Sequence, residues 1–159
     1  MTTGNVERIV QAELERLEQT GEMARLRDFR QHGACSVYEH SVQVAVLALS
    51  MARRLGLRVD EAALVRGALL HDYFLYDWHE PDPDRPLHGF YHPKAALANA
   101  RRDYGVSALE GDIISHHMFP LTLKPPRTKE GLLVCLADKI CAVRETVARE
   151  RRPGDDGGR

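Results

Sequence analysis

The feature that most constrains this chain is a set of histidines and aspartates inside apolar stretches of helical period. Each falls where the pattern calls for a buried apolar side chain, in the stretches VYEHSVQVA, GALLHDYF, DIISHHMF and LLVCLADKI. Burying a polar side chain costs free energy unless a partner satisfies it. A metal ion is a partner that imidazoles and carboxylates can share, because both are ligands of first-row metals. The sequence therefore predicts helices that meet around a metal.

Apolar residues recur at steps of three and four along most of the chain, which is the period of an amphipathic helix. No stretch sustains the alternation of β-branched and polar residues that is typical of a strand. The pattern predicts helices over residues 5–19, 22–30, 36–55, 60–71, 93–104, 107–117 and 128–149. We expect an all-α fold, a single-domain helical bundle of about six or seven helices.

Short motifs indicate where some of these helices begin. Ser36 and Glu39 have the spacing of a capping box, and Asp60 is the expected N-cap of the following helix. Pro93 is expected at the first position of a later helix, where proline is favoured. The intervening residues 73–91 are rich in proline and aromatic side chains, which favours an ordered loop over a pocket.

The composition is that of one soluble domain, with 159 residues of which 43% are hydrophobic and 28% charged. We expect residues 1–30 to form an N-terminal helical segment that packs on the core, residues 31–150 the metal-binding domain, and residues 151–159 a disordered tail. The net charge of −1 argues against nucleic-acid and membrane partners. The three cysteines form no C-x-x-C pair, and no signal peptide is evident, so a cytoplasmic location fits best.

Four of the inward-facing groups come from three predicted helices. His40, His71 and Asp138 each follow apolar residues by one helical turn, and Asp72 is rotated by about 100° from His71. Taken alone, each is more often a hydrogen-bonded core residue than a ligand. Taken together, they are hard to satisfy by separate hydrogen bonds, whereas shared coordination satisfies all of them.

Other histidines are assigned by their position. His92 precedes Pro93 after an aromatic run, and we predict that it is a further ligand. His88 is an alternative to it, or a substrate contact. His32 and His79 are expected at the surface.

His116 and His117 present an ambiguity, because neighbouring positions on a helix cannot point the same way. Ile113 lies one turn before His116, and also one turn before His117. We favour His116 as the ligand and place His117 beside it in the pocket.

This arrangement resembles the HD superfamily of metal-dependent phosphohydrolases, whose signature reads here as His40, the pair His71-Asp72, and Asp138 over residues 36–144. His92 and His116 match the additional ligands of its two-metal subgroup. In ligand order the chain is similar to bacterial HD-type diadenosine tetraphosphate hydrolases. Tyr and Phe follow the His-Asp pair in place of a small residue and a lysine, so no role is carried over for that lysine. The stretch MFPLTLKPP lacks the glycine-rich motif of the cyclic-dinucleotide phosphodiesterase branch.

The resemblance implies two divalent transition-metal ions, drawn from Fe, Mn, Co, Ni or Zn, and cleavage of a phosphate ester or anhydride by metal-activated hydroxide. Asp72 would bridge the ions, because a carboxylate offers two oxygens. The implied ligands of one ion are His40, His71 and Asp138, and those of the other are His92 and His116. Charge on the phosphoryl group calls for cations, for which Lys139 and Arg127 rank first, with Lys94 and Lys124 behind them.

The expected partner is a small phosphorylated substrate of nucleotide type, with no nucleic acid and no membrane. A homodimer is one option for the oligomeric state. Two alternatives stay open: an HD-fold di-iron oxygenase with the same ligands, and a non-catalytic metal-binding regulatory module.

Overall fold

The computed structural model describes residues 3–77, 79–80, 83–84 and 87–150. Within them the chain forms six α-helices, one 3-10 helix and a two-stranded hairpin, which confirms the predicted all-α class. The elements are α1 (Thr3–Thr20), η1 (Met23–Asp28), β1 (Arg30–His32), β2 (Cys35–Ser36), α2 (Val37–Arg54), α3 (Glu61–Leu70), α4 (His88–Tyr104), α5 (Ala108–His116) and α6 (Lys129–Glu150). The predicted tail at 151–159 lies outside the described residues, as do residues 78, 81–82 and 85–86 of the predicted loop.

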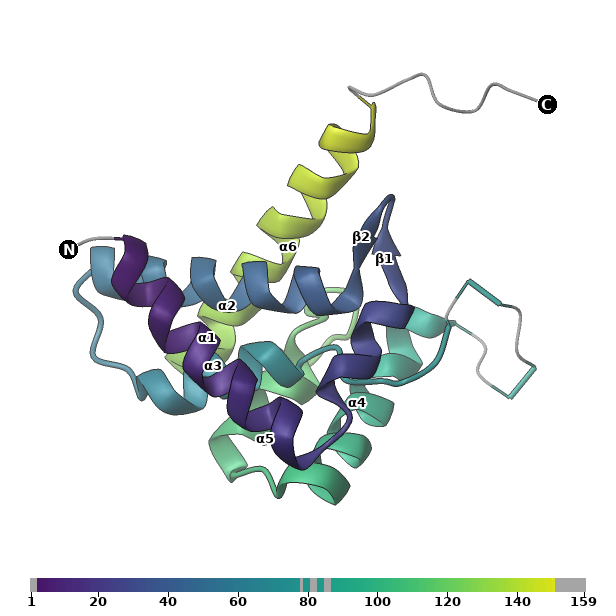
Figure 1. Cartoon of the computed structure of the whole chain (residues 1–159), viewed down its shortest axis with the longest axis horizontal. Helices are drawn as coiled ribbons and strands as arrows, with labels where there is room; N and C mark the ends of the chain where they lie inside the picture. The colour runs from purple at the N-terminus through teal and green to yellow at the C-terminus, as the bar shows by residue number, and fades with distance from the viewer. Residues whose placement is uncertain (1–2, 78, 81–82, 85–86, 151–159) are drawn as a thin grey trace.

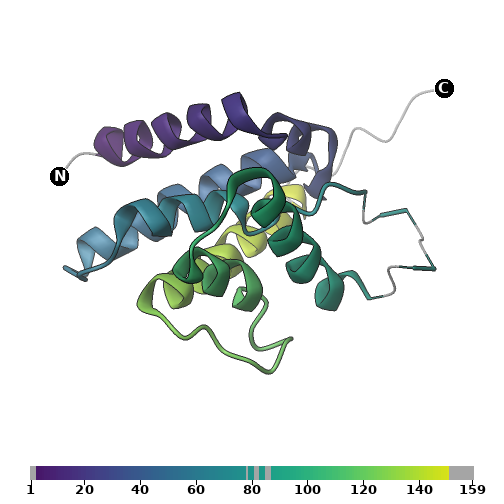
Figure 2. The same ribbon diagram turned by 90° about the horizontal axis from the view of Figure 1, so that it is seen from below.

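Helix α2 is the centre of the bundle and contacts α1, α3 and α6 (Figure 1). α1 and α5 lie on opposite sides of the α2–α3 layer (Figure 2). The core between these helices is built largely from alanine, valine and leucine, and Leu49, Leu64 and Ile113 are fully buried. At Gly67 the packing of α3 on α5 is so close that an added Cβ would lie 2.7 Å from Ile113 Cδ1.

Three helix starts agree with the motifs that cap them. The Ser36 side chain accepts a hydrogen bond from the Glu39 backbone N–H, and the Glu39 side chain accepts one from the Ser36 backbone N–H. The predicted capping box is therefore confirmed at α2. Asp60 caps α3 through the backbone N–H of Ala63, at 3.0 Å. Ser107 caps α5 in the same reciprocal way as Ser36.

Helix α4 begins earlier than the sequence indicated. It starts at His88 rather than Pro93, because the backbone N–H groups of Phe90 and Tyr91 both bond to the Leu87 carbonyl and close a turn ahead of the proline. Pro93 therefore lies inside the helix, where its ring removes one backbone hydrogen bond. The consequence for the site is that both His88 and His92 lie on α4, one turn apart.

The hairpin β1–β2 was not predicted, since strands of three and two residues are too short to show alternation. Arg30 pairs with Ser36 and His32 with Cys35, in antiparallel register. Gly33 makes the turn with φ of 64°, a conformation that favours glycine. The hairpin leads directly into α2 and brings Gln31 to the buried polar centre.

Two tyrosines join the α1–η1 connection to the rest of the bundle. The Tyr73 hydroxyl accepts from the Glu22 backbone N–H at 3.0 Å and donates to Asp103 at 2.8 Å. The Tyr104 hydroxyl accepts from the Met23 backbone N–H at 3.1 Å and donates to the Leu17 carbonyl. These bonds hold α1 against the helices that carry the site.

Candidate metal centre

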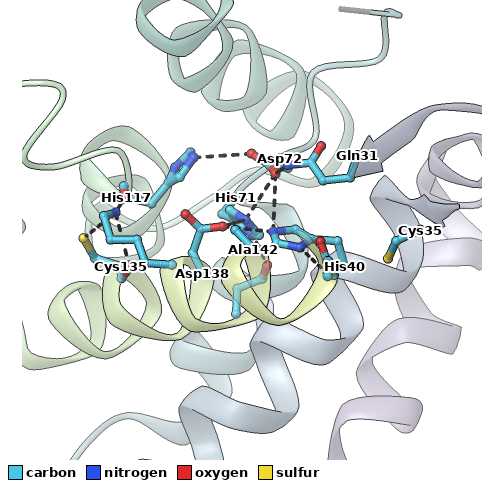
Figure 3. Close-up of polar contacts among 12 residues, drawn as sticks. Gln31, Cys35, His40, His71, Asp72, His117, Cys135, Asp138 and Ala142 are labelled. Atoms are coloured by element: carbon cyan, nitrogen blue, oxygen red, sulfur yellow. Dashed lines mark hydrogen bonds and ion pairs between the residues drawn. The ribbon is translucent and has the colours of Figure 1, made fainter. Parts of the chain in front are cut away.

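Seven ligand atoms from six residues meet inside the bundle in two groups that share Asp72. Figure 3 shows the side chains of His40, His71, Asp72, His117 and Asp138 gathered in one place. Within each group the ligand atoms lie within 4.8 Å of one another. We call His40, His71, Asp138 and Asp72 Oδ2 the first half-site. We call His92, His117 and Asp72 Oδ1 the second half-site. Asp72 therefore offers one carboxylate oxygen to each.

In the first half-site, Asp138 Oδ1 lies 2.9 Å from His40 Nε2 and 3.5 Å from His71 Nε2. Asp72 Oδ2 lies 3.3 Å from His71 Nε2 and 3.9 Å from His40 Nε2. The two imidazoles and two carboxylates come from α2, the end of α3, and α6. This convergence confirms that residues distant in the sequence face a common point.

In the second half-site, His92 Nε2 and His117 Nε2 lie 3.2 and 3.3 Å from Asp72 Oδ1. The two Nε2 atoms are themselves 2.9 Å apart. His92 comes from α4 and His117 from the C-terminal cap of α5. All three residues are buried.

Each of the four imidazoles is anchored through its other nitrogen. The Nδ1 atoms of His71, His92 and His117 donate to backbone carbonyls at 2.6, 2.9 and 2.8 Å. Nδ1 of His40 donates to Glu145 Oε1 at 2.8 Å. A carbonyl can only accept, so the proton of a neutral ring resides on Nδ1 and Nε2 presents its lone pair to the centre.

These residues fit a bound metal. Nε2 of His71 and Oδ1 of Asp72 are buried with no hydrogen-bond partner, although carboxylates and imidazoles surround them. The Nε2 lone pairs of His92 and His117 face each other and an anionic oxygen, an arrangement that a cation stabilises. Nitrogen and carboxylate ligands suit Fe, Mn, Co, Ni or Zn.

The charges of these groups are coupled to their neighbours. Burial disfavours the protonated ring of His40, but hydrogen bonds to Asp138 and Glu145 outweigh it and raise the pKa of His40 to about 9. Burial likewise opposes ionisation of Asp72, yet the imidazoles of His71, His117 and His92 hold its pKa well below the usual range. Burial lowers the pKa of His117. Asp72 is therefore anionic and His117 neutral near pH 7.

Our choice between the adjacent histidines is not supported by the geometry, which places His117 rather than His116 at the centre. α5 ends at His116, and the next residue is rotated by about 100°, which turns His117 toward Asp72. His116 Nδ1 pairs instead with Asp112 at 2.8 Å. It lines a separate cavity with Arg127 and Thr128, so Arg127 also lies away from the two half-sites.

A cavity of about 560 Å³ opens onto both half-sites. Besides the polar residues of the half-sites, its lining includes the apolar residues Met118, Pro120, Leu121 and Ala142. Lys139 lines this cavity, and its ammonium donates to the His117 carbonyl at 2.8 Å.

Among the remaining histidines, His88 lines the cavity and stacks on His92 with ring centroids 4.4 Å apart. His32, which we expected at the surface, also lines it, because the hairpin carries it there. His79 is exposed, as predicted.

A family model for the HD domain matches residues 37–143. The chain belongs to the HD domain family. Membership places it among metal-dependent hydrolases, the class the sequence predicted.

Curated relatives of this HD domain carry the name ribonuclease Y. The chain is 36% identical to ribonuclease Y of Thermotoga maritima over 115 residues, which is 72% of this chain and 20% of that protein. It is 37% identical to that of Thermus thermophilus over 122 residues, or 77% of this chain and 19% of that protein. The chain thus spans about a fifth of these relatives. No solved structure matches it.

These relatives are named ribonuclease Y, so they do not support a specific similarity to diadenosine tetraphosphate hydrolases. The name also gives no support to the expectation that this protein has no nucleic-acid partner. In the part of the chain that the structure describes, no helix is long and apolar enough to cross a bilayer.

Two polar residues beside the half-sites were not predicted from the sequence. Gln31 Nε2 donates to Asp72 Oδ2 at 2.7 Å, and Glu145 accepts from His40. Glu145 follows Asp138 by two helical turns, a spacing that could have suggested a shared face. Gln31 carried no such signal, because its contact depends on the hairpin.

Proposed function

We propose that this chain is a metal-dependent phosphohydrolase that cleaves a phosphodiester or phosphoanhydride bond in RNA or a nucleotide. The observation that carries the proposal is the pair of half-sites on the two oxygens of Asp72, with four imidazole Nε2 atoms directed at them. A metal pair held there would lower the pKa of a bound water and neutralise charge on the phosphoryl group.

The residues of the chain have distinct roles in this proposal. His40, His71 and Asp138 would hold one ion and His92 and His117 the other, with Asp72 offering an oxygen to each. Gln31 orients the Asp72 carboxylate through its amide.

Other residues of the cavity would act on the substrate. Lys139 lines the cavity, with its ammonium hydrogen-bonded to the His117 carbonyl, and would contact a phosphate oxygen. The apolar lining residues Met118, Pro120 and Leu121 suit a nucleobase.

The substrate class rests on the relatives. They are named as ribonucleases, so an RNA phosphodiester is the first candidate. Dinucleoside polyphosphates stay in the proposal as the finer alternative that the ligand order suggested. The proposal also includes a cytoplasmic location. It keeps the expected division of the chain at residue 30, between an N-terminal helical segment and the metal-binding domain.

A substrate panel tests this function. Protein reconstituted with Mn²⁺, Fe²⁺, Co²⁺, Ni²⁺ or Zn²⁺ is incubated with short RNA oligonucleotides, nucleotides and dinucleoside polyphosphates, in parallel without and with dioxygen. We expect hydrolysis of at least one class, abolished in Asp72→Ala and retained in His116→Ala. Undiminished turnover by Asp72→Ala contradicts the mechanism. Substrate loss that requires dioxygen identifies the oxygenase alternative instead.

A further inference from the structure

Helix α6 contributes two carboxylates to one imidazole of the centre. Asp138 Oδ1 lies 2.9 Å from His40 Nε2, and Glu145 Oε1 lies 2.8 Å from His40 Nδ1. The two acidic residues are two turns apart on the same face of α6, and the ring of His40 lies between them.

His40 differs in this respect from the other three histidines, whose Nδ1 atoms donate to neutral backbone carbonyls of their own helices. Glu145 is a charged partner supplied by a different helix, 105 residues away in the sequence. A hydrogen bond from Nδ1 to a carboxylate fixes the tautomer of the ring and makes Nε2 a stronger electron donor.

The burial of Glu145 ties it to the charge of its partner. Its side chain is 7% exposed, and Oε2 is buried with no hydrogen-bond partner. An anionic group so enclosed is costly unless its charge is compensated. A positive charge on the His40 ring compensates it, and a cation held at His40 Nε2 would do so through the neutral ring.

We propose that Glu145 is a positioning residue of the metal centre, which orients His40 and strengthens the first half-site selectively. The inference rests on the proposed metal centre and assigns a specific residue to its support. Among the described residues, the ion pair of Glu145 is with His40 of the first half-site, so we expect the second half-site to be unaffected.

A graded pair of substitutions separates charge from shape. Glu145→Gln keeps an oxygen that can accept from Nδ1 but removes the charge, whereas Glu145→Leu removes the acceptor. Glu7→Gln removes an equivalent charge from an exposed position on α1 and serves as the matched control. Calorimetric titration with Mn²⁺ measures the affinity of each half-site, and the visible spectrum of the Co²⁺ protein reports the ligand field.

We expect Glu145→Gln to weaken one of two binding events by about 10-fold, and Glu145→Leu by up to about 100-fold, with the other event unchanged. The Co²⁺ spectrum should change in both Glu145 variants and stay unchanged in Glu7→Gln. Circular dichroism establishes that each variant is helical. If Glu145→Leu fails to fold, the near-isosteric Glu145→Gln decides the question.

Wild-type affinity and spectrum in folded Glu145→Gln would overturn the inference, as would equal weakening of both events. Absence of metal binding by the wild type would instead overturn the proposed function. The two failures are therefore distinguishable.

Discussion

Replacing His117 with alanine tests the second half-site, because His116 provides a matched control one residue away. His117 is 1% exposed and its Nε2 lies 3.3 Å from Asp72 Oδ1. His116 pairs with Asp112 outside the centre. Both substitutions remove the same imidazole from neighbouring positions, but only His117→Ala removes a group that faces Asp72.

The size of the effect follows from binding linkage. An ion at a free concentration of 100 times its dissociation constant stabilises the folded chain by about 2.7 kcal/mol. For a chain of this length, about 1 kcal/mol corresponds to roughly 2–4 °C in Tm, so each occupied half-site should raise Tm by about 5–11 °C. His117 is one of three residues in its half-site, so its loss should remove most of that increment at the same metal concentration.

The assay is thermal unfolding of chelator-treated protein, with and without added Mn²⁺ or Co²⁺, for the wild type and both variants. The quantity compared is the metal-induced rise in Tm within each variant, because His117→Ala also leaves a cavity that lowers the Tm of the metal-free protein. We expect a smaller rise in His117→Ala and a wild-type rise in His116→Ala. The reverse ranking would refute the geometric reasoning.

Two further predictions concern the scaffold. Gly67→Ala should lower the free energy of unfolding by about 1–3 kcal/mol in denaturant titrations, since its Cβ would lie 2.7 Å from the buried Ile113; an unchanged midpoint would mean that Ile113 moves freely. Hydrogen bonds from Arg102 and Tyr73 lower the pKa of Asp103 in the folded chain, despite its partial burial. The ionised Asp103 therefore stabilises the fold above its unfolded-state pKa of about 4, and this stabilisation is lost as the pH falls through its lower folded-state pKa. Asp103→Asn should therefore be less stable than the wild type at pH 7 and should show a smaller loss of stability on acidification, whereas parallel pH profiles would contradict this.

Much of the fold was predictable because helices are encoded locally. The capping box at Ser36, the N-cap at Asp60 and the apolar period reproduce the starts of α2 and α3. The predicted start of α4 at Pro93 was wrong, because the first turn of the helix closes earlier, on the Leu87 carbonyl. A proline expected at the first helical position gives no signal of a turn that precedes it. The hairpin was missed because its strands are too short to carry a pattern.

Five of the six predicted ligands lie in the two half-sites, and their roles as ligands are the proposal that metal binding will test. His40, His71 and Asp138 were identifiable because a polar residue in an apolar stripe is visible in the sequence itself. The sequence did not separate His116 from His117, because both follow apolar residues by one turn, and the geometry now favours His117. Their difference lies in the direction each side chain takes at the end of α5.

The sequence by itself determined that this chain forms helices with histidines and aspartates on their buried faces, because periodicity records which side of a helix avoids water. Only the tertiary structure decided which of those groups share Asp72, and that Gln31 and Glu145 support them. The physical reason is that a rotation of about 100° per residue turns a side chain toward or away from the centre. That direction has meaning only once the neighbouring helices and the hairpin are in place.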